Sequence, residues 1–370
     1  MNFKTRAIAA LEKNGALLAR KSAVVGFDGF VDTLVTPVAL RKAQGDAFTP
    51  IETIEAFGRR IIAAAGKSTN IELYPRMDKL GGNGPIMANA ILAAGARLTY
   101  IGALGAPDIH PVFRDFAARA TVHSLVNPAH TIAVEFDDGK LMLGQMRSLD
   151  EITYERVIGA VGGDTLVRTL AEADLVSLVN WTMIPNATAL FRGIVENVLP
   201  KLPPRERVFF FDLADPEKRS KEDLLEVLGL VSRFEAFGRV TFGLNLKEAQ
   251  QVDAALGFAT TRADEAGLRQ MASDIREKLR VSTVVVHPKE SAACATADGR
   301  TAWIPGPYVE KPLITTGAGD HFNAGFCNAQ LLGLQPEECL ATGVCTSGHY
   351  VRTGVSPDVP AIIALLGSWN

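Results

Sequence analysis

The chain has 370 residues, of which 47% are hydrophobic and 21% charged, and its formal net charge is −3. This composition is that of a globular protein with a large core. The absence of a long basic run argues against nucleic acid as a partner. No apolar run approaches the length of a membrane span, and residues 1–22 lack the uninterrupted apolar stretch of a signal peptide, so we predict a surface helix there.

The four cysteines, Cys294, Cys327, Cys339 and Cys345, show no CxxC spacing. Three of them lie in sequence that is typical of helices. We therefore expect buried free thiols in a cytoplasmic protein and no metal site built from cysteine.

From about residue 173 onward, short apolar strands alternate with helical segments. Strands are predicted at 175–179, 208–211, 240–243 and 283–287, after earlier ones at 23–27 and 98–104. Helices are predicted at 188–198, 221–237 and 268–279. Alternation of this kind indicates a mainly parallel sheet covered by helices on both faces.

Two regions interrupt this alternation. Residues 33–79 combine a helical stretch at 51–65 with short pieces rich in Pro, Gly and Thr. Residues 131–136 and 141–146 alternate around an Asp-Gly turn, which is typical of a hairpin. We expect segments at about 33–50, 67–80 and 130–147 to supply the strands of a small β lid, within a single domain spanning 1–370.

The stretch from Thr315 to Asp320 leads through a small-residue turn into a predicted helix. Such a turn lets a ligand approach the backbone closely, and the N–H groups of a helix N-terminus suit an anion. Asp320 would then accept a proton from an alcohol while the N–H groups hold a phosphoryl group. Taken alone, the pattern fits a helix-capping Asp at least as well.

Two further polar stretches lie where open α/β sheets place ligands. Asp28 and Asp32 follow the strand at 23–27. Gly81-Gly82-Asn83-Gly84-Pro85 precedes a helix of small residues that Gly95 ends. Each of these stretches alone is equally typical of turns and caps.

In their order along the chain, five stretches resemble the signatures of the ribokinase-like (PfkB) family of sugar and nucleoside kinases. The resemblance covers about residues 23–360 and rests on Asp32, Gly81–Gly105, Asn245-Leu246-Lys247-Glu248, Thr316–Asp320 and Tyr350–Pro357. It implies a three-layer α/β/α fold with a mainly parallel central sheet and a small β lid. It also implies ATP and Mg²⁺ as cofactors and a sugar or nucleoside as the second substrate.

The resemblance assigns roles to individual residues. Asp320 would be the catalytic base beside an anion hole formed by Gly317, Ala318 and Gly319. Substrate hydroxyls would be held by Asp32, Gly81, Gly82 and Asn83, with Asp28 as an additional candidate. Nucleotide and phosphates would be held by Asn245, Glu248, Lys289, Thr316 and Gly354, and Asn245 and Glu248 would organise the metal through water.

The chain departs from the family pattern in three stretches. Pro85 and Ile86 stand where an Asn that contacts the sugar is usual. Ile314 replaces an acid that helps to hold a monovalent cation, which argues against dependence on K⁺. Lys289 lies where many members have Thr-x-Gly, and it would reach a phosphate as a point charge or remain a solvated loop lysine.

The leading hypothesis is an ATP-dependent kinase that phosphorylates a hydroxymethyl group of a sugar or sugar-like compound. The alternatives are a nucleoside kinase of the same fold and a non-catalytic protein that binds a sugar or nucleotide. A Rossmann dehydrogenase is set aside because no G-x-G-x-x-G turn follows the first strand. The resemblance also suggests a homodimer that forms through the lid.

Overall fold

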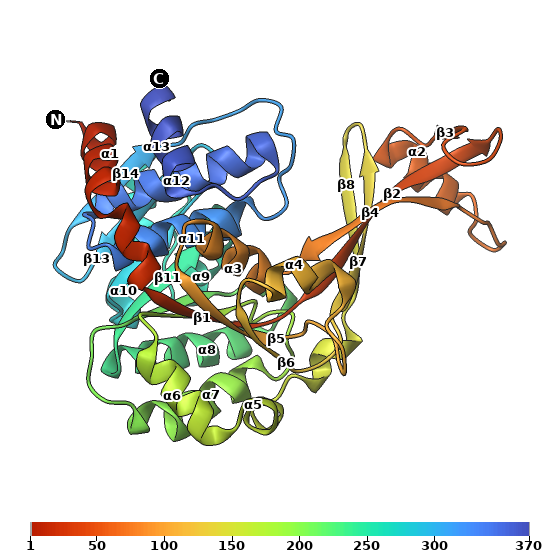
Figure 1. Cartoon of the computed structure of the whole chain (residues 1–370). Coiled ribbons are helices and arrows are strands. Elements are labelled where there is room, and N and C mark those ends of the chain that lie inside the picture. Colours follow the sequence, from red (N-terminus) through yellow and green to blue (C-terminus); the bar gives the residue numbers. More distant parts are fainter. Residues whose placement is uncertain (1, 370) are drawn as a thin grey trace.

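The computed structural model describes residues 2–369, and a nine-stranded sheet forms its centre (Figure 1). In spatial order the strands are β14 (Thr301–Pro305), β13 (Ser291–Thr296), β12 (Thr283–Val286), β11 (Arg239–Leu244), β10 (Val208–Asp212), β9 (Leu175–Val179), β1 (Ser22–Phe27), β5 (Arg97–Gly102) and β6 (Thr121–Ser124). All pairs from β12 to β6 are parallel, whereas β13 and β14 are antiparallel additions at one edge.

Both faces of this sheet are apolar, because successive residues of a strand point to opposite sides. Phe209 and Val284 belong to the core under α5 (Tyr154–Val161), α6 (Gly163–Glu172), α7 (Ala187–Asn197), α8 (Lys221–Arg233), α9 (Leu246–Ala255) and α10 (Glu265–Leu279). Their neighbours Phe210 and Val285 pack under α1 (Phe3–Asn14), α3 (Asn83–Ala93), α11 (Ala318–Leu331), α12 (Pro336–Thr353) and α13 (Val359–Ser368). The predicted three-layer arrangement is confirmed.

A second sheet of five strands projects from the core as an arm with α2 (Ile54–Ile62) near its end (Figure 1). Its strands are β2 (Phe30–Arg41), β3 (Phe48–Pro50), β4 (Leu73–Gly81), β7 (Ala129–Phe136) and β8 (Gly139–Gln145). The long β2 pairs antiparallel with β4 and β3 and parallel with β7, and β7 and β8 form a hairpin. The small lid expected from the sequence is therefore present.

Short helical segments complete the chain. They are α4 (Arg114–Ala117) and the 3-10 turns η1 (Gly15–Arg20), η2 (Pro111–Phe113), η3 (Arg147–Glu151), η4 (Leu199–Lys201), η5 (Pro216–Lys218) and η6 (Phe234–Ala236). All four cysteines are free and buried, as predicted. Within residues 2–369, no helix combines the length and the apolar character needed to cross a membrane.

The chain departs from the predicted elements at three places. The helix expected over residues 1–22 ends at Asn14 and continues as the 3-10 turn η1. The helix expected from Ile86 begins earlier, at Asn83. The β13–β14 hairpin was not predicted, because β13 is rich in alanine and β14 is a short strand that ends in proline, and neither has the β-branched runs of the parallel strands.

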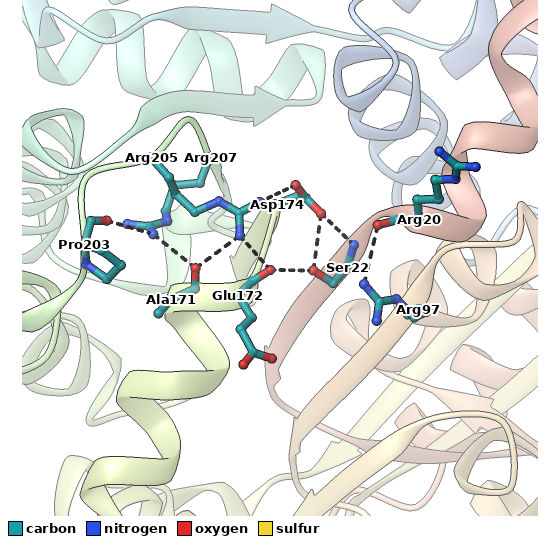
Figure 2. Close-up of polar contacts among 9 residues, drawn as sticks. All are labelled: Arg20, Ser22, Arg97, Ala171, Glu172, Asp174, Pro203, Arg205 and Arg207. Carbon is teal, nitrogen blue, oxygen red and sulfur yellow. Dashed lines mark hydrogen bonds and ion pairs between the residues drawn. The ribbon is translucent and has the colours of Figure 1, made fainter.

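At the edge opposite the strands' carboxyl ends, Asp174 joins three segments of the chain (Figure 2). Its carboxylate accepts hydrogen bonds from the Ser22 backbone N–H at 2.9 Å and from Arg205 Nη2 at 2.7 Å. Arg205 also donates to the Glu172 carbonyl at 3.0 Å, and the Ser22 hydroxyl donates to the same carbonyl at 2.7 Å. These bonds fix the start of β1 to the start of β9 and to the segment before β10.

We predict that Asp174→Ala lowers the free energy of unfolding by about 1–3 kcal/mol, because it leaves the Ser22 N–H without its acceptor and removes the carboxylate partner of Arg205, which keeps only backbone carbonyls. Urea unfolding measures this change. Glu206→Ala, an exposed position in the neighbouring loop, is the control and should change stability by less than about 0.5 kcal/mol. Equal effects of the two substitutions would contradict the role given to Asp174.

Candidate active site

Two cavities meet at the carboxyl-terminal edge of the parallel strands. The first, of about 540 Å³, is lined by Asp212, Asn245 and His287 at the carboxyl ends of β10, β11 and β12, and by the turn Gly317–Asp320. The second, of about 1110 Å³, lies between the lid and the core. Its lid side presents Lys79, Glu135 and Lys140, its core side presents Ile86, His321 and Tyr350, and Thr315 lines both cavities.

Asp320 lies in the first turn of α11 and is only 8% exposed. Its Oδ1 accepts a hydrogen bond from Asn83 Nδ2 at 2.9 Å. Burial raises the pKa of Asp320 to about 8, the Asn83 bond opposes that shift, and the charges of Asp28 and Glu248 add to it. The capping explanation for Asp320 is wrong, because the N-cap of α11 is Gly317, which adopts φ 91°.

Asp28 lies beneath the site and is completely buried. Its carboxylate accepts from the backbone N–H groups of Asn83 at 2.9 Å and Gly84 at 2.8 Å and from Asn180 Nδ2 at 2.6 Å. Burial raises the pKa of Asp28 to about 6, and these three bonds lower it in part. Because it is enclosed by N–H donors at the start of α3, the geometry does not support the expected contact between Asp28 and a substrate.

Asp32 sits on β2 opposite Lys79 of β4 and Thr131 of β7, so these side chains share one face of the lid. Burial raises the pKa of Asp32, whereas the charges of Lys79 and Lys140 lower it. A Cβ atom at Gly81 would lie 2.4 Å from the Asp32 carboxyl carbon, so only glycine allows this approach. Lys79, Glu135 and Lys140 bring charge from the same lid to the second cavity.

The glycine turn connects Asp32 to Asp320. Gly82 adopts φ 94° as the N-cap of α3, a conformation that favours glycine. Directly after it, Asn83 bonds Asp28 through its backbone and Asp320 through its side chain. The structure thus brings the predicted residues Asp32, Gly81, Gly82, Asn83 and Asp320 together.

The Asn-x-x-Glu motif is a capping box at the start of α9. Asn245 Oδ1 accepts from the Glu248 N–H at 3.0 Å, and Glu248 Oε2 accepts from the Asn245 N–H at 2.9 Å. The other Glu248 oxygen accepts from the Asp215 N–H at 2.9 Å. Both motif residues line the first cavity, where Glu248 is buried and its pKa is raised mainly by that burial.

The remaining predicted residues lie at different places. Thr316 precedes the turn, and its hydroxyl accepts a hydrogen bond from the Lys140 ammonium of the lid. Lys289 is an exposed residue at the rim of the first cavity. Gly354 ends α12 at φ 72° and lines the second cavity, not the first, so its predicted nucleotide contact is not supported.

Asp212, which was not predicted as a site residue, ends β10 and lines the first cavity. Asp212 accepts from Asn323 Nδ2 at 2.8 Å and from the Ala214 N–H at 2.9 Å. Burial raises its pKa well above the usual range, and the charges of Glu248 and Asp320 raise it further. Its position directly after a predicted strand is the signal that singled out Asp28, and it would have identified Asp212 as well.

The buried carboxylates suit a metal ion that arrives with its own phosphate and water ligands. Among residues 2–369, no group of three or more His, Cys, Asp or Glu side chains is arranged to hold an ion by itself. Asp212, Glu248 and Asp320 nevertheless influence one another's pKa, which places their negative charges close together. Mg²⁺ commonly binds through one or two carboxylates together with substrate phosphates and several waters.

Comparisons with known proteins agree with this geometry. A model of the prokaryotic ketohexokinase family matches residues 4–369. The ketohexokinase of Haloferax volcanii is 30% identical over 346 residues, which are 93% of this chain and 90% of that relative.

Two solved structures support the fold alone, because their sequence identities are low. Arabidopsis thaliana ribokinase, in complex with ribose and ATP, has a TM-score of 0.64 at 16% identity and covers 94% of this chain and 98% of its own. A protein described as a ribokinase II from Escherichia coli, in complex with ATP and Mg²⁺, has a TM-score of 0.63 at 12% identity. The alignment with the Escherichia coli protein covers 94% of this chain and 99% of that chain.

The family resemblance, the fold and the kinase activity expected from the sequence are confirmed, and the hypothesis of a non-catalytic binding protein is not supported. The chain belongs to the prokaryotic ketohexokinase family and is a carbohydrate kinase that phosphorylates a hydroxyl group.

Proposed function

We propose that this kinase transfers the γ-phosphoryl group of ATP to a hydroxymethyl group of a ketohexose. The observation that carries the proposal is that two cavities meet at Thr315, directly before the Gly317–Asp320 turn, with Asp320 in the first cavity and the adjacent His321 in the second. The choice of a ketohexose as acceptor rests on the relative from Haloferax volcanii, which is described as a ketohexokinase. A nucleoside as acceptor finds less support, because neither the family model nor that relative points to one.

The second cavity offers groups that suit a polyhydroxylated acceptor. Asp32 lies on the lid opposite Lys79, which lines this cavity, and its carboxylate can accept hydrogen bonds from vicinal hydroxyls. Asn83, in the lining of the adjoining first cavity, can both donate and accept. Lys79 and Lys140 donate from the lid strands. In this proposal Lys140, already bonded to Thr316, helps to close the lid over the acceptor and to exclude water.

Asp320 acts as the base in the proposed reaction. Its carboxylate takes the proton of the hydroxymethyl group, and the alkoxide oxygen attacks the phosphoryl group in line with the departing ADP. Of the expected anion hole, the backbone N–H groups of Gly317 and Gly319 face the charge on that group, whereas the Ala318 N–H is bonded to the Thr315 carbonyl at 3.2 Å. Asn83 holds Oδ1 of Asp320, so the other carboxylate oxygen is directed to the acceptor.

Asp212 and Glu248, with Asn245 through water, are the residues proposed to hold Mg²⁺. The ion would neutralise the charge that develops on the phosphates. Lys289 at the rim is proposed to reach the nucleotide phosphates as a point charge. Ile314 offers no charge for a monovalent cation, so the proposal includes no requirement for K⁺.

The proposal extends to assembly and location. Leu40, Ile62 and Met77 are exposed apolar side chains on the arm, and we propose that they meet a second copy of the chain in a homodimer. The four free cysteines support a reducing compartment such as the cytoplasm. The assignment of residues 1–370 to one domain stays a prediction.

A panel of acceptors tests the substrate class. With ATP and Mg²⁺ present, we expect a ketohexose such as fructose to release ADP with a kcat/KM at least about tenfold above ribose and adenosine. A coupled assay of ADP release measures this ratio. Preference for adenosine would replace the proposal with a nucleoside kinase.

Asp320→Asn tests the base. The substitution keeps the shape and removes the proton acceptor, so we expect kcat to fall by about 100- to 10,000-fold while the KM for ATP stays within about threefold. Asp164→Asn, an exposed residue at the start of α6, is the matched control and should leave turnover unchanged. Turnover retained in Asp320→Asn would remove Asp320 from its role.

The raised pKa of Asp320 predicts a pH dependence. Below pH about 8 the carboxyl group of the free enzyme is protonated, so kcat/KM should fall about tenfold per pH unit there and level off above. Asn83 lowers the pKa of Asp320, so Asn83→Ala should move this limb to higher pH. A limb that moves to lower pH, or a flat profile between about pH 6 and pH 9, would contradict the assignment.

A further inference from the structure

His321, the residue after Asp320, is buried and bonded on both sides of its ring. Nδ1 lies 2.7 Å from the Gly317 carbonyl oxygen, and Nε2 lies 2.8 Å from the Ser356 hydroxyl. The ring stacks on Tyr350 with a centroid separation of 3.6 Å and an interplanar angle of 12°. A buried ring with three contacts of this kind has one orientation.

The direction of these hydrogen bonds follows from their partners. A carbonyl can only accept, so Nδ1 carries the proton. Burial lowers the pKa of His321 to about 4, which leaves the ring neutral near pH 7, so Nε2 accepts from the Ser356 hydroxyl. The Ser356 oxygen in turn accepts from Asn89 Nδ2 at 3.1 Å. Helix α3 is thereby connected through Ser356 and His321 to the turn that starts α11.

Tyr350 acts on the neighbouring peptide group. Its hydroxyl donates to the Thr316 carbonyl at 3.1 Å. A peptide unit is planar and trans, so the N–H of Gly317 points away from the carbonyl that Tyr350 holds. Likewise, the Ala318 N–H points away from the Gly317 carbonyl held by His321, and it closes the turn on the Thr315 carbonyl at 3.2 Å.

His321 and Tyr350 line the second cavity, whereas Gly317, Ala318 and Gly319 line the first. Two carbonyls are therefore held on the acceptor side of the turn. The N–H groups of Gly319 and Asp320 in the first turn of the helix have no intrahelical partner and remain available, whereas the Ala318 N–H is bonded to Thr315. The Gly317 carbonyl also accepts from the His321 backbone N–H at 3.1 Å, so Gly317 at φ 91° is held by this helix bond together with the two side-chain bonds.

We propose that His321 is a positioning residue, which holds the Gly317 carbonyl through Nδ1 and so keeps the Gly317–Asp320 turn in the conformation that binds the transferring phosphoryl group. Tyr350 supports the same turn at Thr316. This inference rests on the proposed function, because it assigns the turn to the phosphoryl group. It adds two residues that neither touch the nucleotide nor supply the base.

Two isosteric substitutions separate the two ring nitrogens. His321→Asn keeps a donor at the position of Nδ1, whereas His321→Gln keeps a polar group near the position of Nε2 only. We expect His321→Asn to retain kcat within about fivefold and His321→Gln to lose about 10- to 100-fold, less than the direct loss of an oxyanion donor. KM for both substrates should stay within about threefold in each variant. His349→Gln on α12 is the control for the same chemical change.

A binding measurement makes the test independent of the acceptor. Aluminium fluoride with ADP mimics the transferring phosphoryl group, so it should raise the affinity for ADP in the wild type and His321→Asn but not in His321→Gln. ADP alone should bind all three equally. Equal gains in affinity, or equal kcat in the two variants, would overturn the proposal, whatever sugar the wild type uses.

Tyr350→Phe tests the proposal independently of whether the variants at position 321 fold. It keeps the stacked ring and removes only the bond to Thr316, and we expect kcat to fall about 3- to 10-fold with an unchanged melting temperature. If both His321 variants fail to fold, full activity in Tyr350→Phe would overturn the proposal. Failure of the wild type to phosphorylate a ketohexose would count against the proposed acceptor and not against this role.

Discussion

The site depends on the hydrogen bonds that Asp28 accepts at the start of α3. Because this carboxylate holds the backbone of Asn83 and Gly84, the Asn83 side chain is directed to Asp320 at the start of α11. Two helix N-termini from distant parts of the chain therefore face each other across one hydrogen bond. Asn180, at the end of β9, completes the environment of Asp28 and fixes it to the central sheet.

A second constraint is electrostatic. Asp28, Asp212, Glu248 and Asp320 are buried near one another, and burial raises the pKa of each. Burying carboxyl groups is costly unless N–H donors or cations compensate them. Backbone and amide donors compensate Asp28 and Glu248, whereas Asp320 has only Asn83 as a side-chain partner. A raised pKa of this kind is typical of a residue that accepts a proton during a reaction.

Sequence patterns predicted the parallel strands well, since their uniform apolar runs admit few alternatives. They failed for β13, whose small residues carry little periodic signal, and for β14, which is only five residues long. The ordered motifs led to Asp320, Asn83 and Glu248, but they did not separate Asp32 from Asp28. Only the tertiary packing shows that N–H donors enclose Asp28. His321 gave no signal, because a buried residue in an apolar helix gives no indication of which carbonyl its ring holds.

The measurement that tests the account most directly is a crystal structure of the Asp320→Asn variant with a ketohexose and a non-hydrolysable ATP analogue. The account predicts the sugar between the lid residues of the second cavity and position 320 in the first, with a hydroxymethyl oxygen within about 3.2 Å of the side chain at position 320. It also predicts the terminal phosphate against the N–H groups of the Gly317–Asp320 turn. A sugar bound away from Asp32 and position 320, or phosphates bound away from that turn, would contradict it.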